Sequence, residues 1–158
     1  DGAAGVVRTV DALLRVLEGA GTLDYVATSY GRVKTADTKA VLFRARAFLV
    51  DRVDGGDKGE GEGPTLRPPS MCVELVGDRF LRRMVRILVS TAVREAVRVV
   101  SDSDDRQEDS ALLNIILSGD RKACARPAPP EGLIFVSASF GNNRWGRKIL
   151  SNGSQKIK

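Results

Sequence analysis

The chain contains no histidine among its 158 residues. Within this chain, that excludes nucleophilic catalysis by a Ser-His or Cys-His pair and any metal site built on imidazole. The two cysteines are too few for a disulfide scaffold, and we find no signal peptide or apolar run of membrane length. We therefore expect an intracellular protein with no membrane partner, and the compartment (cytoplasm, nucleus or mitochondrion) stays open.

Aromatic residues are also scarce, at 5% of the chain, so the core must consist mainly of aliphatic side chains. An apolar share of 42% in 158 residues is enough for one folded domain. The formal charge of +5 is unevenly placed, because residues 141–158 contain five cations and no acid. Arginine predominates over lysine. Because the planar guanidinium of arginine can donate two parallel hydrogen bonds to a phosphate, this composition mildly favours nucleic acid as a partner.

Apolar periodicity and turn residues predict an α+β fold, an antiparallel sheet with helices packed on one face. Helices are expected at 9–17, 79–100 and 110–117, and strands at 39–53, 70–76 and 133–140. In the first strand, Val41, Phe43, Ala45, Ala47 and Leu49 should share one face. We expect one domain over residues 1–140, with a mobile loop at 54–69, followed by a basic tail at 141–158 that lacks order.

The predicted long helix carries three arginines within five positions, Arg82, Arg83 and Arg86. A helix that only fills a core would not hold so many guanidinium groups, because burying an unpaired charge is costly. Helical projection places Arg82, Arg83, Arg86, Arg94 and Arg98 on one arc opposite the apolar side chains, with Arg86 at its border. This arc is either a solvated charged face or a surface that binds an anionic ligand.

A second motif, Ala128-Pro129-Pro130-Glu131-Gly132-Leu133, leads into the apolar run that ends at Val136. The prolines predict an extended approach and a rigid turn, and Gly132 would let another backbone come close to the surroundings of Leu133. Taken alone, such a turn is more often structural than functional.

The two motifs in this order resemble the C-terminal half of TruA-type tRNA pseudouridine synthases. The family's "F-L-x-x-M-V-R" helix corresponds to Phe80–Arg86, its "D-R" to Asp120-Arg121, and its "A-P-x-x-G-L" to Ala128–Leu133. Weaker similarity links the segment ending at Asp24-Tyr25 to the family's "G-x-H-D-F", without the histidine. The resemblance covers roughly residues 10–140.

The resemblance implies that the full-length protein isomerises uridine to pseudouridine in RNA, most naturally tRNA, without a metal or other cofactor. Arg86 would be the ion-pair partner of the catalytic aspartate, and Leu133 would pack on the flipped base. Arg82 and Arg83 are further candidates for substrate binding. The nucleophile belongs to a motif "R-T-D-x-G-V-H" in the family's N-terminal half, and Arg8-Thr9-Val10-Asp11 matches only its start.

The resemblance thus implies that the chain's own N-terminal catalytic domain supplies the aspartate, that the isolated chain is inactive, and that a homodimer can form. Two alternatives stay open. One is a non-catalytic RNA-binding or ribosome-associated relative of the same fold, and the other is an unrelated α+β protein. Ile87 and Ser90 stand where the family often has Asn and Gly, so the surroundings of Arg86 can differ here.

Overall fold

The computed structural model describes residues 2–30, 37–50, 70–101 and 110–139 of the chain. Its elements, in chain order, are α1 (Gly2–Gly19), β1 (Thr22–Asp24), a 3₁₀ turn (Val26–Thr28), β2 (Lys39–Val50), β3 (Ser70–Gly77), α2 (Met84–Ser101), α3 (Ala111–Ser118) and two further 3₁₀ turns (Arg121–Ala123 and Pro130–Gly132). The expected loop at 54–69 and tail at 141–158 lie outside the described residues.

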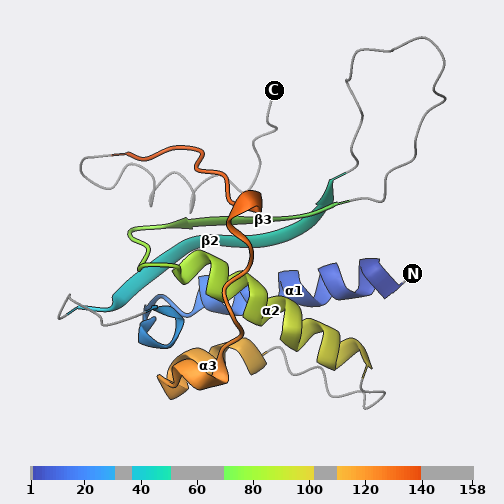
Figure 1. Ribbon diagram of the computed structural model, residues 1–158, viewed down its shortest axis with the longest axis horizontal. Coiled ribbons are helices and arrows are strands. Elements are labelled where there is room, and N and C mark those ends of the chain that lie inside the picture. The colour runs from blue at the N-terminus through green and yellow to red at the C-terminus, as the bar shows by residue number, and fades with distance from the viewer. Residues whose placement is uncertain (1, 31–36, 51–69, 102–109, 140–158) are drawn as a thin grey trace, which may run out of the picture.

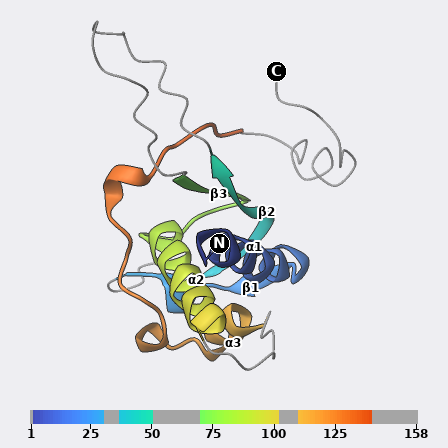
Figure 2. The same ribbon diagram turned by 90° about the vertical axis from the view of Figure 1, so that its right-hand side faces the viewer.

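The fold is α+β, as predicted, with one antiparallel sheet in the order β1-β2-β3. Helices α1, α2 and α3 lie on the same side of this sheet (Figures 1 and 2). The core forms where α1 packs against β2 and α2, and it is mainly aliphatic, as the composition requires. Its largest fully buried side chains include Leu13, Leu14, Leu17, Leu42 and Leu88.

Helix α1 buries the apolar stripe that the sequence predicts, namely Val10, Leu13, Leu14 and Leu17. It begins at Gly2 rather than at Thr9, so the helix is longer than expected. Thr9 lies inside the helix, where its hydroxyl donates to the Gly5 carbonyl, and it is not an N-cap. Over the described residues, no helix combines the length and apolarity needed to cross a bilayer.

Strand β2 contains an irregularity that shifts its buried face. The pairing with β3 slips between Leu42 and Arg44, leaving Phe43 as an extra residue. The buried positions are consequently Ala40 and Leu42 before the slip, and Ala45 and Ala47 after it. The prediction of one continuous face was therefore correct for the two alanines and wrong for Val41 and Phe43. Strict alternation cannot reveal a bulge in advance.

Two carboxylates of α1 cover the edge of β2 that β1 leaves open. The Ala45 N–H donates to Glu18 at 2.9 Å, and the Ala47 N–H donates to Asp11 at 3.0 Å. Glu18 also binds both terminal nitrogens of Arg46. Unpaired strand N–H groups are a usual site of unwanted pairing, and here the helix satisfies them.

Helix α2 begins at Met84, five residues later than predicted. Arg83 adopts a left-handed backbone (φ 61°), which a helix cannot contain, and Arg82 and Arg83 form a turn ahead of it. The expectation that Arg82 and Arg83 share a helical arc with Arg86 is therefore wrong. The apolar arc itself is confirmed, because Met84, Leu88, Ala92 and Ala96 are buried against the core.

The strand predicted at 133–140 is absent over residues 133–139, and position 140 lies outside the described residues. The third strand is β1 instead, which was not predicted from the sequence. Side chains from Leu133 to Val136 are 53–89% exposed, so nothing in the described part of the chain pairs with or covers this segment. Its β-propensity is high, but a strand needs a neighbour.

Removing the Glu18 carboxylate should destabilise the domain. Glu18→Ala leaves the half-buried Ala45 N–H and the Arg46 guanidinium without their acceptor, which should lower the free energy of unfolding by about 1–3 kcal/mol. Urea unfolding followed by circular dichroism measures the change. Arg15→Ala, which removes an exposed ion pair on the same helix, should cost less than about 0.5 kcal/mol. Equal losses would contradict the edge-covering role of Glu18.

Candidate functional site

Residues 120–132, here called the α2 strap, run along the surface of α2. The strap is extended between its two 3₁₀ turns, as its prolines predict. Four consecutive contacts join side chains of the helix to the strap backbone. Arg94 donates to the Ala123 carbonyl, the Ala125 N–H donates to the Thr91 hydroxyl, Ser90 donates to the Arg126 carbonyl, and Arg86 donates to the Ala128 carbonyl.

Ser90 and Thr91 occupy helix-interior positions that usually favour neither residue. Here Thr91 is buried, and its hydroxyl donates to the Ile87 carbonyl while accepting from Ala125 at 3.0 Å. Ser90 donates to the Arg126 carbonyl at 2.6 Å. A hydrophobic residue at either position would leave a strap group unpaired, so these polar residues specify where the strap lies.

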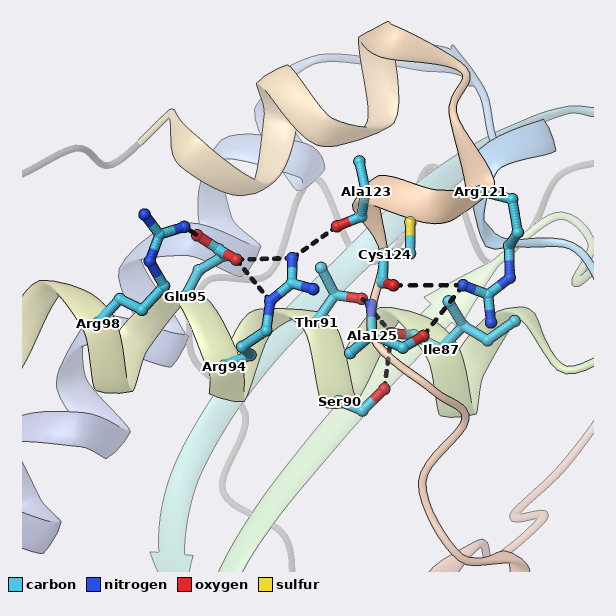
Figure 3. A network of polar contacts seen from close by, with 10 residues as sticks. All are labelled: Ile87, Ser90, Thr91, Arg94, Glu95, Arg98, Arg121, Ala123, Cys124 and Ala125. Carbon is cyan, nitrogen blue, oxygen red and sulfur yellow. Dashed lines mark hydrogen bonds and ion pairs between the residues drawn. The ribbon is translucent and has the colours of Figure 1, made fainter.

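The cationic arc predicted for α2 divides into two parts in the structure. Arg94 and Arg98 both pair with Glu95, at 2.7 and 3.0 Å, and Glu95 is only 4% exposed (Figure 3). These two arginines therefore neutralise a buried acid, and Arg94 also holds the strap, so the pair is not a free anion-binding surface. The acidic stretch of the sequence at 102–109, which follows α2, lies outside the described residues.

The strap's first turn has a structural role. The Asp120 carboxylate accepts from the Lys122 N–H, and Arg121 donates to the carbonyls of Cys124 and Ala125 (Figure 3). Burial raises the pKa of the Cys124 thiol, which argues against a reactive thiolate. The "D-R" pair thus closes the turn from which the strap departs.

Asp24 and Tyr25, in the weaker region of resemblance, are structural too. Asp24 accepts from the Val26 N–H and the Thr38 hydroxyl, and the Thr38 bond is the main cause of its lowered pKa. Tyr25 is fully buried, and burial raises the pKa of its hydroxyl. That hydroxyl has no hydrogen-bond partner among the described residues.

Arg86 is the arginine best placed for chemistry. It is half-buried, and Arg86 and Ala128 exchange two bonds, because the Ala128 N–H also donates to the Arg86 carbonyl at 3.1 Å. The guanidinium uses Nε for the strap, so its two terminal nitrogens remain without an ion-pair or hydrogen-bond partner among the described residues. A guanidinium that is fixed through Nε and has both terminal nitrogens unoccupied by described residues can bind a carboxylate through two parallel hydrogen bonds.

Leu133 follows directly after the Pro130–Gly132 turn, and its N–H donates to the Pro130 carbonyl at 3.0 Å. The structure therefore joins the two sequence motifs, since the turn that presents Leu133 begins two residues after Ala128. Leu133 is 53% exposed. The role expected for Gly132 is not seen, because a Cβ there would meet nothing within 4 Å.

The two remaining candidates lie in the turn before α2. Arg82 is exposed, and its carbonyl accepts from the Tyr30 N–H at 3.2 Å. The Arg83 guanidinium stacks over the Tyr30 ring, 4.0 Å from its centroid. Tyr30 was missed from the sequence, because no spacing rule links it to a residue more than fifty positions away.

Among the described residues, no three His, Cys, Asp or Glu side chains gather as metal ligands would. What the site presents is a fixed guanidinium, an exposed leucine and an arginine–tyrosine stack. Arginine, aromatic and apolar groups of this kind are typical of surfaces that bind nucleic acid.

The comparison with known proteins identifies the family. Residues 32–141, more than half of the chain, match the family described as "tRNA pseudouridine synthase". The chain belongs to this family, and the possibility of an unrelated α+β protein is thereby rejected. The matched region includes β2, β3, α2, α3 and the α2 strap.

Two curated relatives agree. The chain is 30% identical over 71 residues to "tRNA pseudouridine synthase A" of Geotalea uraniireducens (strain Rf4), and 28% identical over 71 residues to the protein of that name in Geotalea daltonii. Each match covers 45% of this chain and 26% of the relative. The matched part of the chain thus spans about a quarter of the relatives' length.

Breaking the buried contact between α2 and the strap should loosen the strap. Thr91→Val keeps the shape but removes the acceptor of the Ala125 N–H, which should cost about 1–3 kcal/mol of unfolding free energy. Hydrogen exchange at the Ala125 amide should become faster at the same time. Thr91→Ser, which keeps the hydroxyl, should preserve the slow exchange. Unchanged exchange in Thr91→Val would show that the strap is held by other contacts.

Proposed function

We propose that this chain forms the C-terminal part of an RNA pseudouridine synthase, with tRNA as the favoured substrate. The observation that carries the proposal is Arg86, because its Nε is bound to the strap while no other described residue occupies its terminal nitrogens, which can therefore bind an anion. Family membership supports the reaction class, the isomerisation of uridine to pseudouridine.

Arg86 would orient and stabilise the carboxylate of a catalytic aspartate supplied from outside this chain. The reaction needs that carboxylate to detach uracil from its ribose, after which the base turns and rejoins through carbon. A carboxylate that accepts two parallel N–H bonds is held in one orientation and kept ionised. Arg86 would supply those two bonds, and the Ala128 carbonyl would prevent the guanidinium from turning away.

Asp11 is not a suitable nucleophile in this arrangement. Its carboxylate accepts from Arg15 and from the Ala47 N–H, and it lies on α1 against the edge of β2. Each of its two oxygens is already engaged. This supports the assignment of the catalytic aspartate to an N-terminal domain that the described residues do not include.

The exposed segment from Leu133 to Val136 supports an interface with that N-terminal domain. Four consecutive large apolar side chains, 53–89% exposed, are unusual on the surface of a finished domain. Leu133 would then pack on the flipped base, and the residues after it would pair with or pack against the missing partner. A homodimer of the full-length protein is a further expectation, which sedimentation equilibrium can measure.

A second candidate is a non-catalytic RNA-binding relative that kept the fold and lost the nucleophile. The free cations around Arg86 would serve either function, so the structure of this chain does not separate the two. Sequencing of the full-length gene does, because an "R-T-D-x-G" segment ahead of residue 1 favours the enzyme.

The isolated chain should bind RNA weakly without converting uridine. Its cations neutralise phosphates, so affinity should fall steeply between 50 and 200 mM salt, by about tenfold or more if several phosphates are contacted. Filter binding to an unmodified tRNA transcript measures affinity. Nuclease digestion followed by chromatography of the nucleosides measures pseudouridine, which has the mass of uridine but a different retention time. Turnover by the isolated chain would overturn the proposal that the nucleophile lies elsewhere.

In the full-length protein, Arg86→Lys should reduce the single-turnover rate far more than Arg98→Lys. Lysine is a point charge and cannot supply two parallel bonds, and a poorly paired buried carboxylate costs about 3–5 kcal/mol. Arg98 is exposed and only pairs with Glu95, so its exchange should cost less than about 1 kcal/mol. RNA affinity should change little in either variant. Equal rate losses in the two variants would indicate that Arg86 has only a structural role.

A further inference from the structure

The contact between Arg83 and Tyr30 is the feature of this surface that the proposed chemistry does not use. The two side chains come from segments far apart in the sequence, and the Tyr30 N–H bond to the Arg82 carbonyl joins those segments. Tyr30 is 45% exposed, so the stack contributes little to the core. A surface aromatic held in place by a guanidinium therefore needs another explanation.

The backbone at Arg83 points to a functional constraint. Arg83 is the one residue other than glycine with a positive φ in the described parts of the chain. This conformation is unfavourable for a residue with a long side chain, and strained backbone of this kind is found mostly at functional sites. It lies where α2 begins, since the Ile87 N–H donates to the Arg83 carbonyl, and it directs the guanidinium onto the tyrosine ring.

The charge around the pair is uncompensated. Among the described residues, Arg82, Arg83 and Arg86 form no ion pair, whereas Arg79, nearby in sequence, pairs with Asp37 at 3.2 Å. Arg83 lies in the turn directly ahead of α2, three residues before Arg86. The Ile87 N–H bond to the Arg83 carbonyl places the Arg83 backbone at the first turn of α2, the turn that contains Arg86.

We propose that Tyr30 and Arg83 form a stacking site for an unpaired RNA base that adjoins the target uridine. A flipped nucleotide leaves its neighbours without their stacking partner, and exposed aromatic rings and guanidinium planes replace such partners. Because Arg83 already fixes the ring, little side-chain freedom is lost when the base binds. The proposal rests on the proposed function only for the identity of the neighbouring uridine.

The test uses the full-length protein and two probes, a nine-nucleotide oligouridylate and an abasic oligoribonucleotide of the same length. Tyr30→Ala should weaken oligouridylate binding about 5- to 100-fold, the range expected for one lost base stack. Binding of the abasic probe should change less than about twofold, because a phosphate contact alone does not need the ring. Tyr30→Phe keeps the ring and should bind both probes like the wild type.

Phe48→Ala provides a matched control, because Phe48 lies on β2 and is 44% exposed, close to the exposure of Tyr30. It should leave both affinities unchanged. Arg83→Asn tolerates the left-handed backbone while removing the guanidinium, and should weaken oligouridylate binding as well. If Tyr30→Ala does not fold, as judged by circular dichroism, Tyr30→Leu replaces it.

The outcomes separate this proposal from the proposed function. Equal weakening of both probes by Tyr30→Ala, or no weakening of either, overturns the stacking site. Pseudouridine formation on an unmodified tRNA transcript is measured in parallel with the wild-type protein. Loss of base-dependent binding in Tyr30→Ala, together with no turnover by the wild type, would support the stacking site and reject the enzymatic function.

Discussion

The exchange of two hydrogen bonds between Arg86 and Ala128 is the contact on which the rest of the site depends. It determines where the α2 strap ends, and therefore where the Pro130–Gly132 turn presents Leu133. It also occupies one side of the guanidinium and leaves the other side for an anion. A single arginine thus positions an apolar group and offers a bidentate fork, which explains why the two motifs matter only together.

The contacts that precede this pair along α2 have a supporting role. Thr91 and Ser90 hold the middle of the strap, and the buried Glu95 holds Arg94 against its start. Isolated surface ion pairs contribute little to stability, but a buried acid with two arginines restricts both of them. Of the arginines projected onto one cationic face, two are therefore structural, while Arg82, Arg83 and Arg86 have no ion-pair partner in the described part of the chain.

Much of the fold could be predicted from the sequence, because most of its elements have regular apolar periodicity. The stripe of α1, the pairing of β2 with β3, the position of α3 and the core face of α2 follow from it. The failures have local physical causes. Phe43 is an extra residue in β2, the left-handed Arg83 delays the start of α2, and the three-residue β1 is too short to show a pattern.

The candidate site was predictable only in part. Arg86 and Leu133 were proposed because a family resemblance joined two distant motifs, and the structure shows that Arg86 of the first motif bonds to Ala128 of the second. Tyr30 could not be found, since its partner Arg83 is near it only in three dimensions. The prediction of a strand after Gly132 was wrong for another reason. High β-propensity favours an extended conformation, but it does not supply the neighbouring strand with which a strand must pair.

The segment from Leu133 to Val136, which the described parts of the chain leave exposed, has a consequence for solubility and for folding in the cell. The stretch from Leu133 to Ser139 has no charge and no proline, and its β-branched and aromatic residues are those from which aggregating strands form. Such a segment, left exposed, tends to recruit copies of itself. Solubility should therefore rise when the segment is covered, and co-expression with the proposed N-terminal domain should increase the yield of soluble protein.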